Sequence, residues 1–333
     1  MKVLFDHTLP FLLGHGGAQI QIEQTKAALE SIGVQVEFLR WWDEHQRGDI
    51  IHYFGRPWPL YVKMAREKGI KVVLADFLGS LGARPTSTRR VQKVIKTAAE
   101  KMLGGELTLR LGWESFRLVD ACFAMTPWEA QLMREMFDAP RQRVHCVPNG
   151  VEDVFFQGRE IRRGRWLVCT ATLTSVKRTL ELAEAAVAAQ RPLWLIGRPF
   201  APDDPYAQRC VQYVQKHSEW IRYEGPIHDR NQMVEAYHQA RGFVLLSAFE
   251  SLSLSALEAA ACGCPLLLSD LPWARCTFED KASYCPVGSR AQTAAILRHF
   301  YDHAPELPIP PRPLSWRQVG ERCRDIYKSL LKR

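Results

Sequence analysis

The chain alternates short apolar runs with longer stretches in which apolar residues recur at helical spacing. Six such runs, rich in β-branched and aromatic residues, occupy its first half. They predict strands at Lys2–Phe5, Val34–Phe38, Asp49–Phe54, Ile70–Leu74, Asp120–Met125 and Val144–Val147. Regular alternation of strands and helices predicts a parallel sheet covered by helices.

A second series of six runs follows the same pattern. It predicts strands at Trp166–Thr170, Pro192–Ile196, Ile221–Tyr223, Phe243–Ser247, Pro265–Ser269 and Ala282–Pro286, separated by helical stretches such as Thr179–Ala189 and Asn231–Ala240. Between the series, Glu152–Arg165 contains two glycines, four arginines and little apolar content, as in a linker. We therefore expect an α/β protein with two Rossmann-like, doubly wound domains, at residues 1–155 and 165–310, facing a cleft.

The last part of the chain begins with five prolines between residues 305 and 313, which predict an extended segment. A helix capped by Ser315 is expected to follow, with apolar positions Val319, Cys323, Ile326, Tyr327 and Leu330 on one face. That face needs a partner, so residues 314–333 are expected to pack on the N-terminal domain.

Length and charge agree with two folded domains. The chain has 333 residues, about twice a typical domain. Its 44 Lys and Arg exceed its 36 Asp and Glu by eight. An anionic partner would suit this excess, be it nucleic acid, an acidic membrane or a phosphorylated small molecule, although solubility alone would also account for it.

The nine cysteines are scattered and mostly lie in apolar runs, which predicts reduced core residues and a cytosolic protein. No Cys-x-x-Cys pair occurs, so no structural metal site is expected. Asp203-Asp204 is interpreted as a turn between prolines and not as a magnesium site. No segment reaches transmembrane length, and no signal-peptide cleavage site follows the N-terminal residues.

A glycine-rich loop follows the first predicted strand. Gly14-His15-Gly16-Gly17 leads into the amphipathic stretch Ile20–Leu29, and such a loop can present backbone amides and a helix N-terminus to a phosphate. A dinucleotide fingerprint would need a third glycine where Gln19 stands. The alternative interpretation of this segment is a loop that binds no ligand.

Two glutamates lie eight residues apart between the fourth and fifth strands of the second series. If Ser253 or a neighbouring residue opens the helix there, Glu250 lies in the loop and Glu258 lies about one turn or more inside the helix. Both carboxylates could then face one ligand, with an anion at the first-turn amides. The alternative is a capping Glu250 and a surface Glu258, although Glu258 is embedded among alanines and a leucine.

The loop after the first strand of the second series is polar and cationic. It runs from Thr170 to Arg178 and includes Lys177. Its chemistry suits a diphosphate, and a solvated basic turn is the alternative.

Further segments matter in combination: VPNGV at Val147–Val151, LIG at Leu195–Gly197, YEG at Tyr223–Gly225 and the terminal SWRQVGERCRDIYKSL. With the two glutamates and Lys177, in this order and spacing, the chain resembles the family 4 retaining glycosyltransferases (glycosyl transferases group 1), most strongly from Val147 onward. The resemblance implies a GT-B fold of two facing Rossmann-like domains. It also implies a nucleotide-sugar donor held mainly by the C-terminal domain, and a terminal helix that crosses back to the N-terminal domain.

The same resemblance implies roles for individual residues. Glu250 contacts the donor sugar, Glu258 binds the ribose hydroxyls, Lys177 neutralises the diphosphate, and Gly16 and Gly17 lie near the phosphates. Amides between Ser251 and Leu254, including that of Ser253, would join Lys177 in stabilising the diphosphate leaving group.

Three departures from the family pattern affect these roles. Thr172 stands where the family usually has an arginine, with Arg178 and Arg198 as possible substitutes. The glycine-rich turn after the first glutamate reads Ser251-Leu252-Ser253. Many members have a histidine after the fourth strand, where this chain has Ala75-Asp76. Asp76, or His52 on the preceding strand, is therefore a candidate for contact with an acceptor hydroxyl, and a core or capping role is the alternative for each.

These features predict a cytoplasmic, metal-independent hexosyltransferase that moves a sugar from a UDP- or GDP-sugar to a hydroxyl acceptor, a glycan precursor or a lipid-linked molecule, with retention. No cofactor other than this substrate and no nucleic-acid partner is expected. Alternatives are a nucleotide-sugar epimerase or hydrolase on the same fold, a non-catalytic binding protein, and an NAD-dependent oxidoreductase, which the incomplete glycine fingerprint disfavours.

The segment Arg84–Lys101 forms a basic amphipathic pattern with six cations and only Glu100 as an acid. Val91, Val94, Ile95, Ala98 and Met102 fall on the face opposite Arg89, Lys93 and Lys96. One interpretation is a helix whose apolar face packs in the core. The other is a helix that docks peripherally on the anionic inner face of a membrane, near a lipid-linked acceptor.

Overall fold

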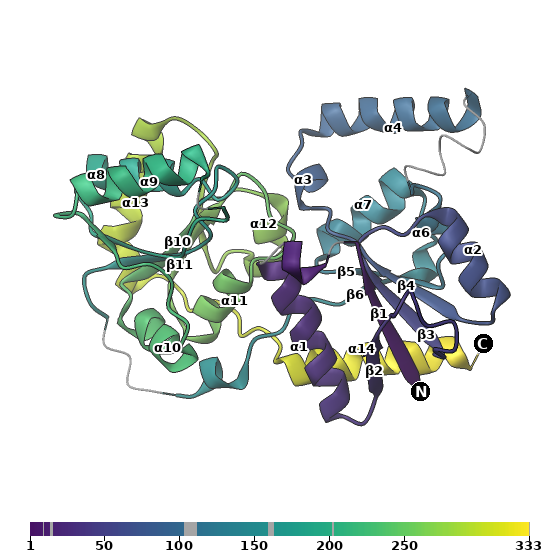
Figure 1. Cartoon of the computed structure of the whole chain (residues 1–333). Helices are drawn as coiled ribbons and strands as arrows, with labels where there is room; N and C mark the ends of the chain where they lie inside the picture. The colour runs from purple at the N-terminus through teal and green to yellow at the C-terminus, as the bar shows by residue number, and fades with distance from the viewer. Residues whose placement is uncertain (9, 14–15, 103–111, 159–162, 202, 333) are drawn as a thin grey trace. The chain divides into compact units, whose positions relative to one another are not determined.

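The computed structural model describes residues 1–8, 10–13, 16–102, 112–158, 163–201 and 203–332. Its contacts divide the chain into two compact units: unit 1 comprises Met1–Asn149 and Trp316–Arg333, and unit 2 comprises Gly150–Ser315 (Figure 1). The sequence placed the boundary within Glu152–Arg165, of which residues 159–162 lie outside the described part. Phe155, at the start of that segment, is buried in unit 2.

Unit 1 is built on one parallel sheet with strand order β2-β1-β3-β4-β5-β6. Its strands are β1 Lys2–His7, β2 Gln35–Phe38, β3 Ile50–Phe54, β4 Lys71–Ala75, β5 Ala121–Ala124 and β6 Val144–Cys146. Its helices are η1 Phe11–Leu13, α1 Gly17–Ser31, α2 Pro59–Glu67, α3 Gly79–Gly82, α4 Thr86–Met102, α6 Ser115–Leu118, α7 Pro127–Phe137, η2 Arg141–Arg143 and α14 Trp316–Leu331.

Successive strand residues point to opposite faces of this sheet, so it has two cores. Leu4, Ile51, Leu74 and Cys122 belong to one, which the buried residues of α2, α6 and α7 complete. The other core is aromatic, and there the rings of His52 and Phe123 contact Tyr327 of α14.

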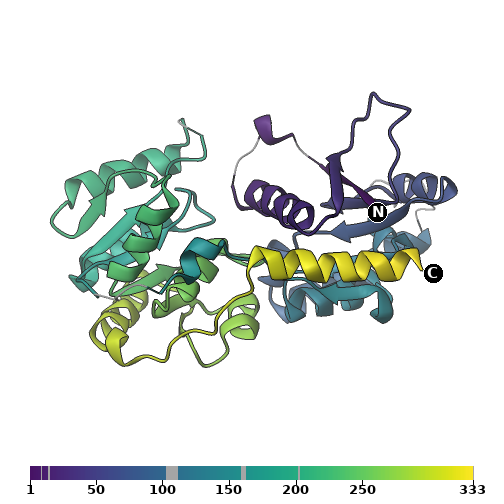
Figure 2. The same cartoon turned by 90° about the horizontal axis from the view of Figure 1, so that it is seen from below.

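The terminal helix α14 packs on unit 1 beside α1, as the yellow helix in Figure 2 shows. Four of the five predicted positions, Val319, Cys323, Tyr327 and Leu330, are buried, which accounts for their helical spacing, and Ile326 is half-buried. A Cβ on Gly320 would lie 3.0 Å from two atoms of Ala28 on α1, its carbonyl carbon and its Cβ. The absence of a side chain at Gly320 therefore allows the two helices to approach closely.

Unit 2 contains a second parallel sheet with strand order β12-β11-β10-β7-β8-β9. Its strands are β7 Leu167–Thr170, β8 Leu193–Ile196, β9 Ile221–Tyr223, β10 Gly242–Leu245, β11 Leu266–Ser269 and β12 Ser283–Cys285. Its helices are η3 Asp153–Phe156, α8 Thr179–Ala189, α9 Pro205–Lys216, α10 Arg230–Gln239, α11 Leu254–Ala261, α12 Pro272–Phe278, α13 Arg290–His303 and η4 Ala304–Glu306.

All twelve predicted strands are present, each within a few residues of its expected position, and the two-sheet α/β architecture is confirmed. Seven of the nine cysteines are buried, and all are free thiols. Asp204 accepts a hydrogen bond from the Tyr206 amide and thereby caps α9, which agrees with its interpretation as a turn residue.

Helix α4 does not bury the apolar face that one interpretation of its sequence placed in the core. Val91, Val94, Ile95 and Met102 are exposed, whereas Lys96 is buried. The alternative in which the apolar face packs in the core is therefore wrong, because the face that turns toward unit 1 carries ion-pairing side chains.

We predict that Gly320→Leu lowers the melting temperature. A leucine there would overlap the α1 backbone at Ala28, and overpacking of this kind typically costs about 1–3 kcal/mol. Arg317→Leu, at a position whose side chain is 68% exposed on the same helix, is the control. Thermal melts followed by circular dichroism measure both variants; equal melting temperatures would contradict the close α1–α14 packing.

Candidate functional site

The strand order of unit 2 reverses between β7 and β10. From β7 the chain proceeds to β8 and β9 on one side of the sheet, and then returns to β10, β11 and β12 on the other. The loops that leave the carboxyl ends of β7 and β10 therefore run in opposite directions. Such a switch point is where doubly wound sheets bind their ligands.

These two loops are held together by direct contacts. The amide of Ala248 donates to the carbonyl of Val176 at 2.7 Å. Lys177 Nζ lies 2.5 Å from Glu250 Oε1, and Ser247 Oγ donates to the same oxygen at 2.7 Å. The structure thus brings together two residues that are 73 positions apart and were predicted separately.

The pair is partly accessible to solvent. The side chain of Lys177 is 27% exposed and that of Glu250 is 11% exposed. A lysine ammonium has three N–H donors, so Lys177 can donate to an anion while one of its N–H groups still donates to Glu250.

Helix α11 begins directly after this pair. Ser253 is its N-cap, and its Oγ accepts from the Ala256 amide at 3.3 Å. The first-turn amides, which include that of Leu254, have no carbonyl partner within the helix. The expectation for this segment is confirmed: Ser253 opens the helix, Glu250 and Ser251 lie in the loop before it, and Glu258 lies in its second turn.

The loop after β8 packs against the Lys177 loop. A Cβ on Gly197 would lie 1.9 Å from the carbonyl oxygen of Ala171, so only glycine fits this approach. The Leu173 amide donates to the carbonyl of Arg198 at 3.0 Å, and the Arg198 side chain is exposed. Arg178 adopts a left-handed conformation, with φ of 51°, immediately before α8.

Glu258 occupies a buried polar network. Arg230 Nη2 of α10 donates to Glu258 Oε1 at 2.6 Å, and the hydroxyl of Tyr237 donates to Oε2 at 3.3 Å. Burial raises the pKa of the Glu258 carboxyl, and Arg230 counteracts this shift. The alternative of a surface glutamate is therefore wrong, because Glu258 is only 8% exposed and its charge is compensated.

Arg230 was not singled out from the sequence. Its guanidinium also pairs with Glu152 and lies 4.9 Å from the ring centroid of Phe155. The spacing of seven between Arg230 and Tyr237 places both side chains on one face of a helix, which is a signal that the sequence contains. Their common partner, Glu258, is visible only in the fold.

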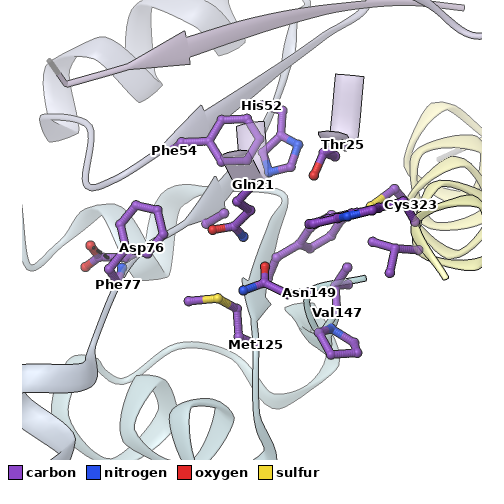
Figure 3. A pocket seen from close by; sticks show the side chains of 15 residues that line it. Gln21, Thr25, His52, Phe54, Asp76, Phe77, Met125, Val147, Asn149 and Cys323 are labelled. Carbon is purple, nitrogen blue, oxygen red and sulfur yellow. Dashed lines mark hydrogen bonds between the residues drawn. The ribbon is translucent and has the colours of Figure 1, made fainter. Parts of the chain in front are cut away.

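Unit 1 contains a separate pocket, shown in Figure 3, between the sheet and helices α1 and α14. Asp76 and Phe77 lie at one end, and Cys323 of α14 lies at the other (Figure 3). Asp76 Oδ2 accepts from Arg56 Nε at 2.9 Å and from Nη2 at 2.7 Å. The candidate acceptor contact is thus a carboxylate held by an arginine.

His52 also lines this pocket but belongs to the aromatic core. Its Nδ1 lies 2.6 Å from the Tyr327 hydroxyl, and its exposed fraction is 2%. Burial lowers the pKa of His52 to about 3, so the ring is neutral at physiological pH. Of the two roles considered for His52, the core role fits this environment.

The glycine-rich loop of unit 1 is described from Gly16 onward, and Gly14 and His15 lie outside the described residues. Gly16 has φ of 137° and precedes the first residue of α1, Gly17. Its carbonyl accepts from the Ile20 amide at 3.2 Å. The helix thus starts at Gly17, three residues before the predicted stretch Ile20–Leu29, and the proximity of Gly16 and Gly17 to a phosphate stays a prediction.

Among the described residues, no group of three or more His, Cys, Asp or Glu side chains is placed to hold a metal ion. Within the same ranges, every helix is too short or too polar to cross a bilayer.

Comparison with known families identifies unit 2. Residues 164–302 match the family model described as glycosyl transferases group 1. Unit 2 carries a group 1 glycosyl transferase domain. The match covers the switch point with Lys177, Glu250, Glu258 and Arg230, and it confirms the family resemblance found in the sequence at this level.

Solved structures share the fold of the group 1 domain and of unit 1. Sucrose-phosphate synthase from Thermosynechococcus elongatus matches with a TM-score of 0.71 and 17% identity, over 99% of each chain. A glycosyltransferase from Rickettsia africae matches with a TM-score of 0.64 and 13% identity, over 99% of this chain and 98% of its own. Anabaena HepE, in complex with UDP and glucose, matches with a TM-score of 0.63 and 13% identity, over 99% and 100%. These likenesses confirm the GT-B fold, and no curated protein matches the sequence.

We predict that Arg230→Met destabilises the group 1 domain increasingly as pH rises. Without Arg230 the pKa of Glu258 is raised further above its unfolded value of about 4.3. A raised carboxyl pKa means that stability is highest at low pH and is lost as the pH rises through the folded-state pKa. Breaking a buried ion pair costs about 3–5 kcal/mol, which we reduce to about 2 kcal/mol because the Arg230 side chain is 34% exposed.

Melting curves between about pH 5 and pH 8 measure this effect. The double variant Arg230→Met/Glu258→Gln is the matched control, since it has no carboxylate to ionise at this position, and its loss of stability should be nearly independent of pH. A pH-independent loss in the single variant would show that Arg230 does not compensate Glu258.

Proposed function

We propose that the chain is a retaining glycosyltransferase that moves a hexose from a nucleotide diphosphate sugar, UDP- or GDP-linked, to a hydroxyl acceptor. The observation that carries this proposal is the Lys177–Glu250 pair at the switch point, beside the N-terminus of α11. This place combines a cation, a carboxylate and the first-turn amides of α11. The complexes of Anabaena HepE with UDP-glucose and of pneumococcal GtfA with UDP and GlcNAc support a donor of this class.

The chemical problem is the leaving diphosphate. As the bond from the anomeric carbon to the diphosphate oxygen breaks, negative charge builds on that oxygen. Lys177, the amides between Ser251 and Leu254 and the α11 dipole would stabilise this charge. Arg178 and Arg198 lie on neighbouring loops and would add positive potential, in place of the family arginine replaced by Thr172.

The acceptor hydroxyl would attack from the diphosphate side, which gives retention. The new glycosidic bond forms as the old one breaks, and the hydroxyl proton passes to the leaving phosphate oxygen. This scheme uses neither a metal ion nor a protein nucleophile, in agreement with the sequence-based expectation.

The two glutamates would bind different parts of the donor, Glu250 the sugar and Glu258 the ribose. Lys177 would keep one N–H bond to Glu250 while it binds the diphosphate, and the other oxygen of Glu250 would accept from a sugar hydroxyl. The charge of Glu250 would face the cationic sugar of the transition state. Glu258, held by Arg230 and Tyr237, still has a lone pair on each oxygen for the ribose hydroxyls.

For the acceptor, Asp76 in the pocket of unit 1 is the residue we propose to contact the hydroxyl, with Gly16 and Gly17 near the phosphates. The acceptor would be a glycan or lipid-linked molecule handled on the cytoplasmic side of a membrane. Incubation with labelled UDP-, GDP- and ADP-sugars tests the reaction: slow release of free sugar supports a transferase, an isomerised sugar would indicate an epimerase, and binding without turnover would indicate a binding protein.

We expect Lys177→Ala to lower kcat at least about tenfold, because removal of one transition-state donor typically costs about a hundredfold or more. Its melting temperature should change little, since the pair with Glu250 is partly exposed. Steady-state kinetics and melting curves measure both effects. Lys281→Ala, which removes a lysine 47% exposed in the same domain, is the control, and full activity of Lys177→Ala would transfer the phosphate role to Arg178 or Arg198.

Glu258→Gln and Glu250→Gln should fail in different kinetic parameters. A carboxylate that accepts ribose hydroxyls acts in both ground and transition states, so Glu258→Gln should raise the donor KM about tenfold with little change in kcat. Glu250→Gln removes a charge beside a developing cation and should lower kcat. Unchanged affinity of Glu258→Gln for the nucleoside diphosphate, measured by calorimetry, would refute the ribose assignment.

A further inference from the structure

Helix α4 has its polar face turned inward and its apolar face turned outward. Figure 1 shows it along the outside of unit 1, with α3 and α7 between it and the sheet. Amphipathic helices of soluble domains normally bury the apolar face. The reversal in α4 requires an explanation from its contacts.

The inward face is held by charged and aromatic contacts. Lys96, only 4% exposed, lies 2.8 Å from Asp138 at the end of α7 and 3.4 Å from Glu100. Glu100 also pairs with Arg117 at 3.4 Å. The guanidinium of Arg89 lies 4.5 Å from the ring centroid of Trp128. These contacts orient α4, and among the described residues its opposite face is uncovered.

The uncovered face carries a stripe of large apolar side chains. Val91 is 58% exposed, Val94 68%, Ile95 60% and Met102 84%. These positions recur at helical spacing and extend over twelve residues, so that their first and last Cα atoms lie about 16 Å apart along the helix. A contiguous stripe of this kind marks an interaction surface.

The charges around the stripe have one sign. Arg84 and Arg90 are exposed and Lys93 is half-buried, while the side chain of Lys101 lies outside the described part. The only acid of α4, Glu100, is turned inward in its ion pairs. The outer face therefore presents apolar side chains flanked by cations whose charge no carboxylate of the helix offsets.

We propose that α4 lies in the surface of an anionic membrane, with Val91, Val94, Ile95 and Met102 inserted among the acyl chains and Arg84 and Arg90 at the lipid phosphates. Helices that lie in the plane of a bilayer combine these two features. A nucleic acid would leave the apolar stripe in water. A second copy of the chain would bring two cationic faces together without a counter-charge, so the membrane is the partner that satisfies both parts of the surface.

The test is flotation of the full chain with vesicles, without nucleotide or acceptor, so that its result is independent of the proposed sugar transfer. We expect binding to phosphatidylcholine vesicles that contain phosphatidylglycerol, and at least tenfold weaker binding to phosphatidylcholine alone. Val94→Ser/Ile95→Ser should weaken binding to the anionic vesicles at least tenfold, and Arg84→Gln/Arg90→Gln should remove its dependence on phosphatidylglycerol and salt.

Leu60→Ser/Met64→Ser on α2 is the matched control, because those side chains are 57% and 53% exposed on the same unit. This variant should bind like the wild type, and melting curves establish that all variants are folded. Equal binding to both kinds of vesicle, no binding at low salt, or equal losses in the α2 and α4 variants would overturn the proposal. So would a dimer, detected by analytical ultracentrifugation without lipid, that Val94→Ser/Ile95→Ser dissociates.

Discussion

The ion pair between Lys177 and Glu250 depends on the topology of the second sheet. Strands β7 and β10 are three strands apart in the chain order but are neighbours in the sheet. The loops that follow them meet because of this arrangement. Each side chain compensates the charge of the other while both stay partly exposed, at 27% for Lys177 and 11% for Glu250, and Glu250 also accepts from Ser247 Oγ. The pair thus keeps a cationic site stable while it is empty, and the same proton donors become available to an anion.

A second ion pair, between Arg230 and Glu258, also constrains the group 1 domain. Glu258 is buried in α11, which raises the pKa of its carboxyl, and Arg230 of α10 opposes this shift through its ion pair with the carboxylate. Arg230 is itself placed by Glu152 and by the ring of Phe155. Residues before β7, after β9 and after β10 are therefore coupled through one guanidinium. In the proposed reaction this coupling fixes the position of the ribose-binding carboxylate relative to Lys177.

Unit 1 differs from unit 2 in its surface, which carries most of the exposed large apolar side chains of the described residues. One face of its sheet is closed by α14, which returns from the end of the sequence and places Tyr327 on His52. The other face is covered by α2, α6 and α7. Helix α4 is needed for neither core, and so its apolar face is available for a partner outside the chain.

The sequence alone determined the strands, the two parallel sheets, the cap at Ser253 and the family of the second domain, because these depend on local periodicity and on motifs that are contiguous in the chain. It also supplied Lys177, Glu250 and Glu258 as separate candidates. Only the tertiary structure decided that Lys177 pairs with Glu250, that Arg230 compensates Glu258, and that α4 turns Lys96 rather than Val94 inward. Helical spacing shows which residues share a face, but which face is buried depends on charged partners such as Asp138, which lie far away in the sequence.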